Sequence, residues 1–291
     1  MDLFQYDFMM RALAGALIIG LAAPSLGIYL VQRRLSLIGD GIGHVALTGV
    51  GVGLLLNQSP VLAAVIVSAI GAIGVELIRE RGRTSGDLAL ALLFYGGIAG
   101  GVVLVSLSDD ASSNSLIQYL FGSLITTSPT DIALIGVLGA LVLTAMLAFR
   151  PALFAVCNDE EYARVSGLPV RTLNLLMAVT TAVTVTIAMR TVGLLLVSAL
   201  MVIPVAAAQQ VTRGFRSTMT VAMLIGVGAA GLGVVFSAEV DTPPGATTVI
   251  VALAVFVAIA VGGTLWRVLR RRSQPPNVVE PPDVVLQGAG R

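Results

Sequence analysis

Nine apolar segments, each close to twenty residues long, divide most of the chain. About twenty residues of α-helix cross a hydrocarbon core of ~30 Å, so each segment is long enough to span a membrane. Their length and the absence of period-two alternation favour helices over barrel strands. The segments cover residues 9–30, 37–56, 60–78, 88–107, 131–149, 172–189, 192–210, 218–237 and 246–266. The sequence therefore predicts an all-α polytopic membrane protein with about nine transmembrane helices, or eight if two segments merge.

Composition supports the same class of protein. Only 11% of the 291 residues are charged, and 56% are hydrophobic, whereas about 25% of the residues in a soluble domain are charged. The formal net charge is +1, so there is no electrostatic reason to expect a nucleic-acid partner. The expected surroundings are membrane lipid.

Residue types that are rare or missing exclude several kinds of chemistry. All 17 basic residues are arginines, so the chain has no lysine for a P-loop or a Schiff base. A single histidine excludes an HExxH zinc enzyme, and a single cysteine, Cys157, excludes an internal disulfide or a multi-cysteine metal site. We find no nucleophile–base set, so we expect no enzymatic activity and no permanently bound cofactor.

The arginines sort into alternate loops and so predict an orientation. One set of loops and the C-terminal tail are rich in arginine, the other set carries acidic residues, and only Arg11 and Arg190 lie on or near the acidic side. The arginine-rich set holds Arg33, Arg34, Arg79, Arg81, Arg83, Arg150, Arg164, Arg171, Arg213 and Arg216. With nine spans, this sorting predicts an N-terminus outside and a cytoplasmic C-terminus. The weakest boundary is the short connection at 190–193, where a broken helix or a tight turn would also fit.

Asp40 and His44 lie inside the second apolar segment, four residues apart, and His44 is the only histidine. Helical spacing puts both on one face, and His44 lies about 15 Å along the helix from Arg34, near mid-membrane. Ionisable groups at that depth usually mark an ion or substrate path. A carboxylate and an imidazole suit borderline divalent metals such as Zn²⁺ or Mn²⁺. A proton relay and a polar pair that only packs helices together remain alternatives.

Two ligands are too few for a closed structural metal site but suit a site that releases its cargo. A symmetric partner chain or water would complete the ligand set. Six glycines in the same segment predict close helix packing, although loosening of the helix around Asp40 and His44 would also fit. Met201 and Pro204, in the seventh segment, are further candidates for the pathway or for gating, since a proline kinks a helix and methionine is a soft ligand. Glu76 beside Arg79 is expected to form an interfacial ion pair.

Three regions lie outside the spans. Residues 112–130 are predicted to form a short helix or a re-entrant piece at the outer face. Residues 158–168 are predicted to form a short cytoplasmic helix, capped by Asn158, acidic in its first turn and ended by Gly167. Residues 267–291 read as a basic, proline-rich disordered tail that follows a transmembrane domain of residues 1–266.

Four stretches resemble the permease subunits of manganese/zinc/iron-type ABC importers, the ABC-3 family. They are RRLSLIGDGIGHVALTGVGVG from Arg33, QYLFGSL at 118–124, NDEEYARVSGLPVRTLNLL at 158–176 and TVGLLLVSALMVIPVAAAQQ at 191–210. The resemblance is collinear over residues 10–266. It implies a type II ABC importer permease fold in the bacterial cytoplasmic membrane, with a divalent metal ion as cargo.

The resemblance also implies partners and residue roles. It implies a homodimer or paired permease, two ATP-binding subunits, and an extracellular or periplasmic metal-binding protein. Asp40 and His44 match the family's metal-pathway residues. The loop similar to the family's ATPase-docking loop comprises Asp159, Glu160, Glu161, Tyr162, Ala163 and Gly167. Tyr162 departs from the strictest form of that motif.

Three functional hypotheses follow. The first is a permease subunit of an ATP-driven importer of manganese, zinc or ferrous iron that works by alternating access, with ATP hydrolysed on a separate chain. The second is a secondary transporter or channel for divalent cations that uses Asp40 and His44 for coupling. The third is a membrane scaffold that transports nothing.

Overall fold

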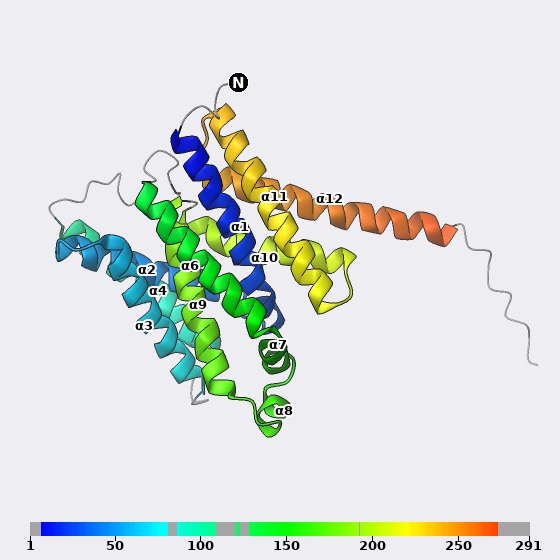
Figure 1. Ribbon diagram of the computed structural model, residues 1–291, viewed down its shortest axis with the longest axis horizontal. Helices are drawn as coiled ribbons and strands as arrows, with labels where there is room; N and C mark the ends of the chain where they lie inside the picture. Colours follow the sequence, from blue (N-terminus) through cyan, green and yellow to red (C-terminus); the bar gives the residue numbers. More distant parts are fainter. Residues whose placement is uncertain are drawn as a thin grey trace, which may run out of the picture.

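The computed structural model describes residues 7–80, 86–108, 120, 122, 128–191 and 193–272, and within these ranges the chain forms helices and turns but no strand. The helices are α1 (Asp7–Gln32), α2 (Ile38–Leu55), α3 (Pro60–Glu80), α4 (Gly86–Ser106), α6 (Pro129–Ala148), α7 (Arg150–Asn158), α8 (Glu160–Val165), α9 (Val170–Thr191), α10 (Leu194–Val211), α11 (Phe215–Val240) and α12 (Pro244–Arg272). Figure 1 shows them as one bundle, with α8 at the end opposite the N-terminus and the second half of α12 extending beyond the other helices.

Each predicted apolar segment is helical over most of its length, and the all-α class is confirmed. The predicted count of about nine spans is too high. In the described part of the chain, seven helices are individually long and apolar enough to cross a membrane, or eight if one bent pair is counted. That pair is α6 and α7, which meet at 67°. A further apolar stretch, Val197–Val211 within α10, is not counted among them.

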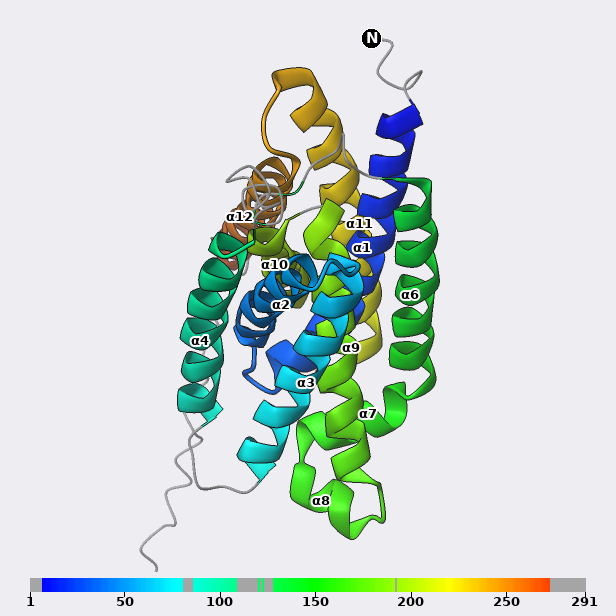
Figure 2. The same cartoon turned by 90° about the vertical axis from the view of Figure 1, so that its left-hand side faces the viewer.

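The helix α2 lies inside the bundle, in contact with α3, α4, α9 and α10 (Figure 2). It is continuous from Ile38 to Leu55, so its glycines do not unwind it. They permit close approach instead: a Cβ added to Gly49 would lie 2.6 Å from the Cα of Ala64 on α3. Small residues bring membrane helices together in this way. The predicted role of the α2 glycines in packing is therefore confirmed.

The helix α1 anchors the other half of the bundle. It crosses α11 where two glycines face each other, since a Cβ on Gly20 would lie 2.7 Å from the carbonyl oxygen of Gly226. On another side, the Tyr29 hydroxyl donates a 2.9 Å hydrogen bond to the carbonyl oxygen of Met146 on α6. The main apolar core runs through α1, α2, α9 and α10, and it fixes the position of α2 relative to its neighbours.

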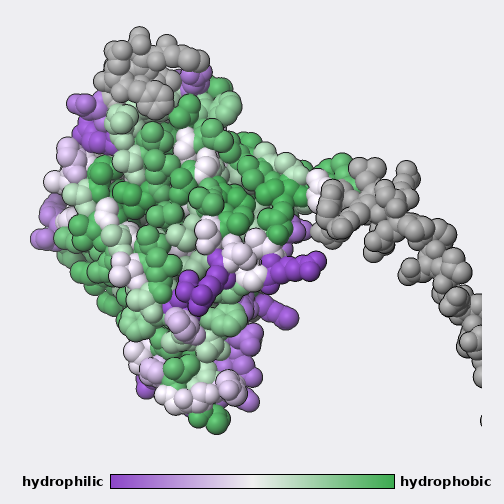
Figure 3. All heavy atoms as spheres, turned by 45° about the vertical axis from the view of Figure 1, so that its right-hand side comes forward, coloured by the Kyte–Doolittle hydropathy of each residue, from purple (hydrophilic) through white to green (hydrophobic). Residues whose placement is uncertain are grey.

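Charged side chains from three arginine-rich connections meet at the α8 end of the bundle. Arg33 pairs with Glu160 at 2.6 Å, and Arg171 pairs with Glu80 at 3.3 Å. Glu76 and Arg79 form the predicted ion pair at 2.6 Å. Figure 3 shows apolar residues over much of one face, with hydrophilic residues gathered lower down and at the edges. The structure thus brings these separate polar loops to one end of an apolar body.

The short connection predicted at residues 190–193 is present, since α9 ends at Thr191 and α10 begins at Leu194. Gly193 between them has a φ of 91°, a left-handed conformation that favours glycine. The expectations for most of residues 112–130, for QYLFGSL apart from residues 120 and 122, and for residues 273–291 lie outside the described residues. The helix α12 continues to Arg272, past the start of the predicted tail.

Candidate functional site

The first two turns of α2 carry Asp40 and His44. Asp40 lies in the first turn, where the positive end of the helix dipole favours a carboxylate. His44 lies one turn further on and is buried, with 8% of its surface exposed, whereas Asp40 is half-buried. Because α2 is an unbroken helix through both residues, their four-residue spacing places them on the same side of it.

The imidazole of His44 meets the edge of an aromatic ring on the neighbouring helix. Its ring centroid lies 4.5 Å from that of Phe94 on α4, with the planes at 80°. The Nδ1 atom of His44 is buried and has no hydrogen-bond partner among the residues that the structure describes. A buried polar atom without a partner is unfavourable, and a neutral imidazole nitrogen with a free lone pair is a good ligand for a transition metal.

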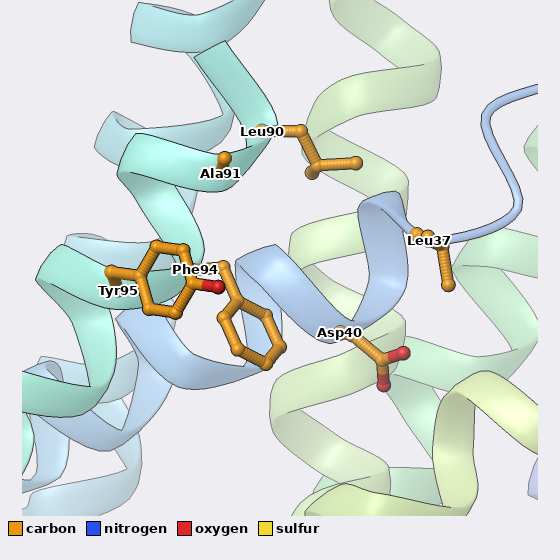
Figure 4. Close-up of a pocket in the computed structure, with 6 residues that line it drawn as sticks. All are labelled: Leu37, Asp40, Leu90, Ala91, Phe94 and Tyr95. Atoms are coloured by element: carbon orange, nitrogen blue, oxygen red, sulfur yellow. The ribbon is translucent and has the colours of Figure 1, made fainter. Parts of the chain in front are cut away.

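A hollow between α2 and α4 opens beside Asp40 (Figure 4). We call it the Asp40 hollow, and its lining residues are Leu37, Asp40, Leu90, Ala91, Phe94 and Tyr95. Its walls are mostly apolar, and the carboxylate of Asp40 is its charged group. Leu37 and Tyr95 are exposed, so the hollow faces the outside of the single chain rather than a closed interior.

Gly97 sets the distance between α4 and the His44 turn. A Cβ at this position would lie 2.6 Å from both the carbonyl carbon of His44 and the backbone nitrogen of Val45. The hydroxyl of Thr48 on α2 donates a 2.8 Å hydrogen bond to the carbonyl oxygen of Gly97. Gly97 and Phe94 could not be recognised from the sequence, because nothing near them in the sequence indicates that α4 packs on this turn.

The helix α10 packs on the first turn of α2, beside Gly39. A Cβ on Gly39 would lie 3.1 Å from the hydroxyl of Ser198 and 3.4 Å from the sulfur of Met201. The hydroxyl of Ser198 is the second buried atom without a hydrogen-bond partner in the described structure. Met201 thus lies against the residue before Asp40, whereas Pro204 is buried further along α10. Since α2 and α4 line the Asp40 hollow, neither Met201 nor Pro204 enters it.

The single chain supplies an incomplete ligand set. Within the described ranges, no group of three or more His, Cys, Asp or Glu side chains gathers in a way that could hold a metal ion. Asp40 and His44 fit a metal in the chemistry of their donor atoms, one oxygen and one nitrogen. They fit a site that takes its remaining ligands from elsewhere.

The short helix α8 forms the second candidate site. Its N-cap is Asp159, whose carboxylate accepts a 2.9 Å hydrogen bond from the backbone nitrogen of Tyr162. The prediction that Asn158 caps this helix is wrong, because Asn158 is still the last residue of α7. Gly167 ends the element as predicted, with a φ of 80° that glycine adopts readily.

The outward surface of α8 is apolar as well as charged. The side chains of Tyr162 and Val165 are 69% and 89% exposed, while Ala163 is fully buried against the bundle. Glu161 is exposed, and Glu160 points to Arg33. Exposed apolar side chains on a short helix at the polar end of the molecule are typical of a surface that binds another protein.

Arg33 joins this surface to the rest of the bundle. Its guanidinium donates hydrogen bonds of 2.7 Å to Asn174 on α9 and 2.6 Å to Glu160 on α8. Only 7% of its side chain is exposed. Burial lowers the pKa of the Arg33 guanidinium from its ordinary value, and the carboxylate of Glu160 opposes that shift.

Comparison with known proteins gives matches over almost the whole chain. The family model described as "ABC 3 transport family" matches residues 5–262. The zinc uptake membrane protein ZnuB of Haemophilus influenzae is 29% identical over 87% of this chain and 97% of its own length. The manganese transport membrane protein MntC of Halalkalibacterium halodurans is 29% identical, over 88% and 87%. The chelated iron transport membrane protein YfeD of Yersinia pestis is 30% identical, over 94% and 91%.

A solved structure shares the fold. It is PsaBC from Streptococcus pneumoniae in complex with Fab, which superposes with a TM-score of 0.81 at 27% identity. The superposition covers 93% of this chain and 97% of that one. The helical arrangement around α2 is therefore shared with a protein of known structure.

Proposed function

Because the chain belongs to the ABC 3 transport family, we propose that it is the membrane-spanning permease subunit of an ATP-driven importer of divalent transition-metal ions, whose path runs past Asp40 and His44. The observation that carries the site assignment is the buried Nδ1 of His44, one helical turn from a carboxylate, which lacks a hydrogen-bond partner within the described part of the chain. A passing metal ion would satisfy this atom, and the half-buried carboxylate would offset part of the ion's charge.

The proposed cargo is manganese, zinc or ferrous iron. One carboxylate oxygen and one imidazole nitrogen per chain suit all three ions, and affinity order alone does not choose among them in cells. Relatives named for zinc, manganese and chelated iron transport support this range. The ion is cargo rather than a resident cofactor, so it must be released. Two ligands from one chain would bind it weakly enough for that.

A second copy of the permease would complete the path. The Asp40 hollow faces outward between α2 and α4, and within the described ranges this chain offers no third clustered ligand. A paired permease that places its own carboxylate and imidazole opposite these two would give a four-ligand shell. Rearrangement of the two copies, open first to one side of the membrane and then to the other, would supply alternating access.

ATP hydrolysis would take place on two separate subunits that bind at α8. The chain has no lysine and so no P-loop of its own. The exposed Tyr162 and Val165 give an ATPase an apolar contact at the arginine-rich end of the bundle. With α8 and the arginine-rich end on the cytoplasmic side, the start of α1, at the opposite end of the bundle (Figure 1), would lie outside. The C-terminal tail, which is also rich in arginine, would be cytoplasmic, and a metal-binding protein would deliver ions to the outer face of the bacterial membrane.

The test is uptake by the complete complex in proteoliposomes. Permease and ATPase subunits are reconstituted with ATP inside or outside, and radioactive manganese or zinc is supplied with the metal-binding protein. We expect accumulation that requires ATP on the ATPase side and is unaffected by collapse of a proton gradient. Uptake driven by a proton gradient without ATP would instead assign the chain to the secondary transporters.

A further inference from the structure

Arg33 lies at a junction of three parts of the molecule. It follows the last residue of α1, and four residues separate it from Ile38, the first residue of α2. Its two terminal nitrogens bind Glu160 on α8 and Asn174 on α9. The guanidinium therefore connects α8 to the segment that leads into α2, the helix that carries Asp40 and His44.

The connection on the Arg33 side is a tight, hydrogen-bonded turn rather than a loose loop. Arg34 has a φ of 59°, an uncommon conformation for a residue with a side chain. The backbone nitrogen of Leu35 donates a 2.8 Å bond to the carbonyl oxygen of Leu30, and that of Ile38 donates a 3.0 Å bond to Leu35. Asp40 lies in the turn that begins with Ile38. Because this turn is short and hydrogen-bonded, a displacement of Arg33 should also displace the first turn of α2.

The ion pair is buried enough to resist dissociation. The side chains of Arg33 and Glu160 are 7% and 34% exposed, and their bond of 2.6 Å is short even for a charge-assisted hydrogen bond. Removing one partner of a buried pair leaves the other charge unpaired, which is strongly unfavourable. The pair therefore moves with α8 more readily than it breaks.

Other ion pairs at this end of the bundle do not make the same connection. Arg171 and Glu80 join α9 to α3 through side chains that are both exposed. Arg79 and Glu76 lie on one helix, three residues apart. Arg33–Glu160 directly joins α8 to the residues that enter α2.

We propose that Arg33 is a positioning residue that couples α8 to the metal site, by holding the first turn of α2 to the docking helix through Glu160. The proposal rests on the proposed function, since α8 must receive the ATPase for its movement to matter. When the ATPase subunits close and shift α8, the pair pulls the Arg33–Ile38 turn and changes the access of Asp40 and His44. Arg33 itself does not contact the ion.

The experiment measures metal ions imported per ATP hydrolysed in proteoliposomes with the complete complex. Arg33→Met is expected to keep ATP hydrolysis while the ratio of uptake to hydrolysis falls at least tenfold, and hydrolysis should no longer depend on metal-loaded binding protein. Arg33→Lys, which keeps the charge, should recover part of the ratio. Arg33→Glu combined with Glu160→Arg should recover more than either single reversal. Arg171→Met, which removes the exposed pair nearby, is the matched control and should leave the ratio unchanged.

The outcomes separate the coupling role from a structural one. A merely structural role predicts that uptake and hydrolysis fall together, with an unchanged ratio, and this result would overturn the proposal. If Arg33→Met does not assemble, Glu160→Gln tests the same contact from its more exposed side and must lower the ratio. A wild-type complex that hydrolyses ATP but imports no metal would refute the proposed function itself, and the coupling role with it.

Discussion

Gly97 on α4 lies directly against the backbone of His44 on α2. An added Cβ would come within 2.6 Å of the His44 carbonyl carbon, and real Cβ atoms do not approach backbone atoms this closely. The obstacle is main chain, so no side-chain rotation relieves it. The glycine therefore sets how closely α4 covers the imidazole, and a larger residue must push the two helices apart.

Gly97→Ala is expected to impair metal uptake and to destabilise the permease by about 1–3 kcal/mol, the usual effect of overpacking. Its neighbour provides the control: Gly96 is exposed, and a Cβ added there meets nothing within 4 Å. Gly96→Ala should be neutral or slightly stabilising, because alanine favours helix over glycine by about 1 kcal/mol. Uptake assays and thermal unfolding in detergent measure both effects. Equal behaviour of the two variants would mean that α4 does not approach His44 this closely.

Two buried serines should respond oppositely to removal of the hydroxyl. The hydroxyl of Ser198 on α10 has no hydrogen-bond partner among the described residues, whereas the hydroxyl of Ser68 on α3 lies 2.9 Å from that of Thr186 on α9. Ser198→Ala should leave the melting temperature unchanged or raise it, because it removes an unpaired polar group. Ser68→Ala should cost about 0.5–1.5 kcal/mol. An equal loss of stability in the two variants would show that the Ser198 hydroxyl has a partner in the native protein.

A charge on the outward surface of α8 should weaken ATPase binding without unfolding the permease. Val165 is 89% exposed, so Val165→Glu changes few contacts within the chain. Burying that carboxylate in an interface should lower the affinity for the ATPase subunit by about tenfold or more. Val240→Glu is the control, since Val240 is also exposed and lies at the end of α11 far from α8 (Figure 1). Affinity is measured by titration in nanodiscs, and equal affinities for the two variants would place the docking surface elsewhere.

The sequence predicted the helices well because hydropathy is a local property. Residues 37–56 and 60–78 correspond closely to α2 (Ile38–Leu55) and α3 (Pro60–Glu80). The span count was less accurate because it depends on a sharp bend between α6 and α7, which hydropathy does not report. The cap of α8 was misplaced by one residue because Asn158 and Asp159 are both good caps, and only the end of α7 decides between them.

Most contacts around the site join residues that are far apart in the sequence, so they are harder to predict than the helices. Asp40 and His44 could be paired from their spacing, since four residues make one helical turn. Arg33 and Glu160 are 127 residues apart, and Phe94 meets His44 from another helix. Local sequence patterns do not predict such partners, because these contacts depend on how the helices pack. The sequence therefore located the chemistry on α2, and the structure adds the residues that position it.

Metal uptake by complexes in which only the proposed ligands are changed tests most directly whether the metal path runs past Asp40 and His44. Asp40→Asn removes the charge and His44→Gln removes the imidazole, and both keep the approximate size of the side chain. Asp241→Asn is the control, because Asp241 is an exposed carboxylate in a left-handed turn that asparagine also tolerates. Assembly with the ATPase is checked by gel filtration before ATP-driven uptake of manganese and zinc is measured. We expect background uptake for Asp40→Asn and His44→Gln and normal uptake for Asp241→Asn. Normal uptake by all three assembled complexes would show that Asp40 and His44 do not bind the passing ion.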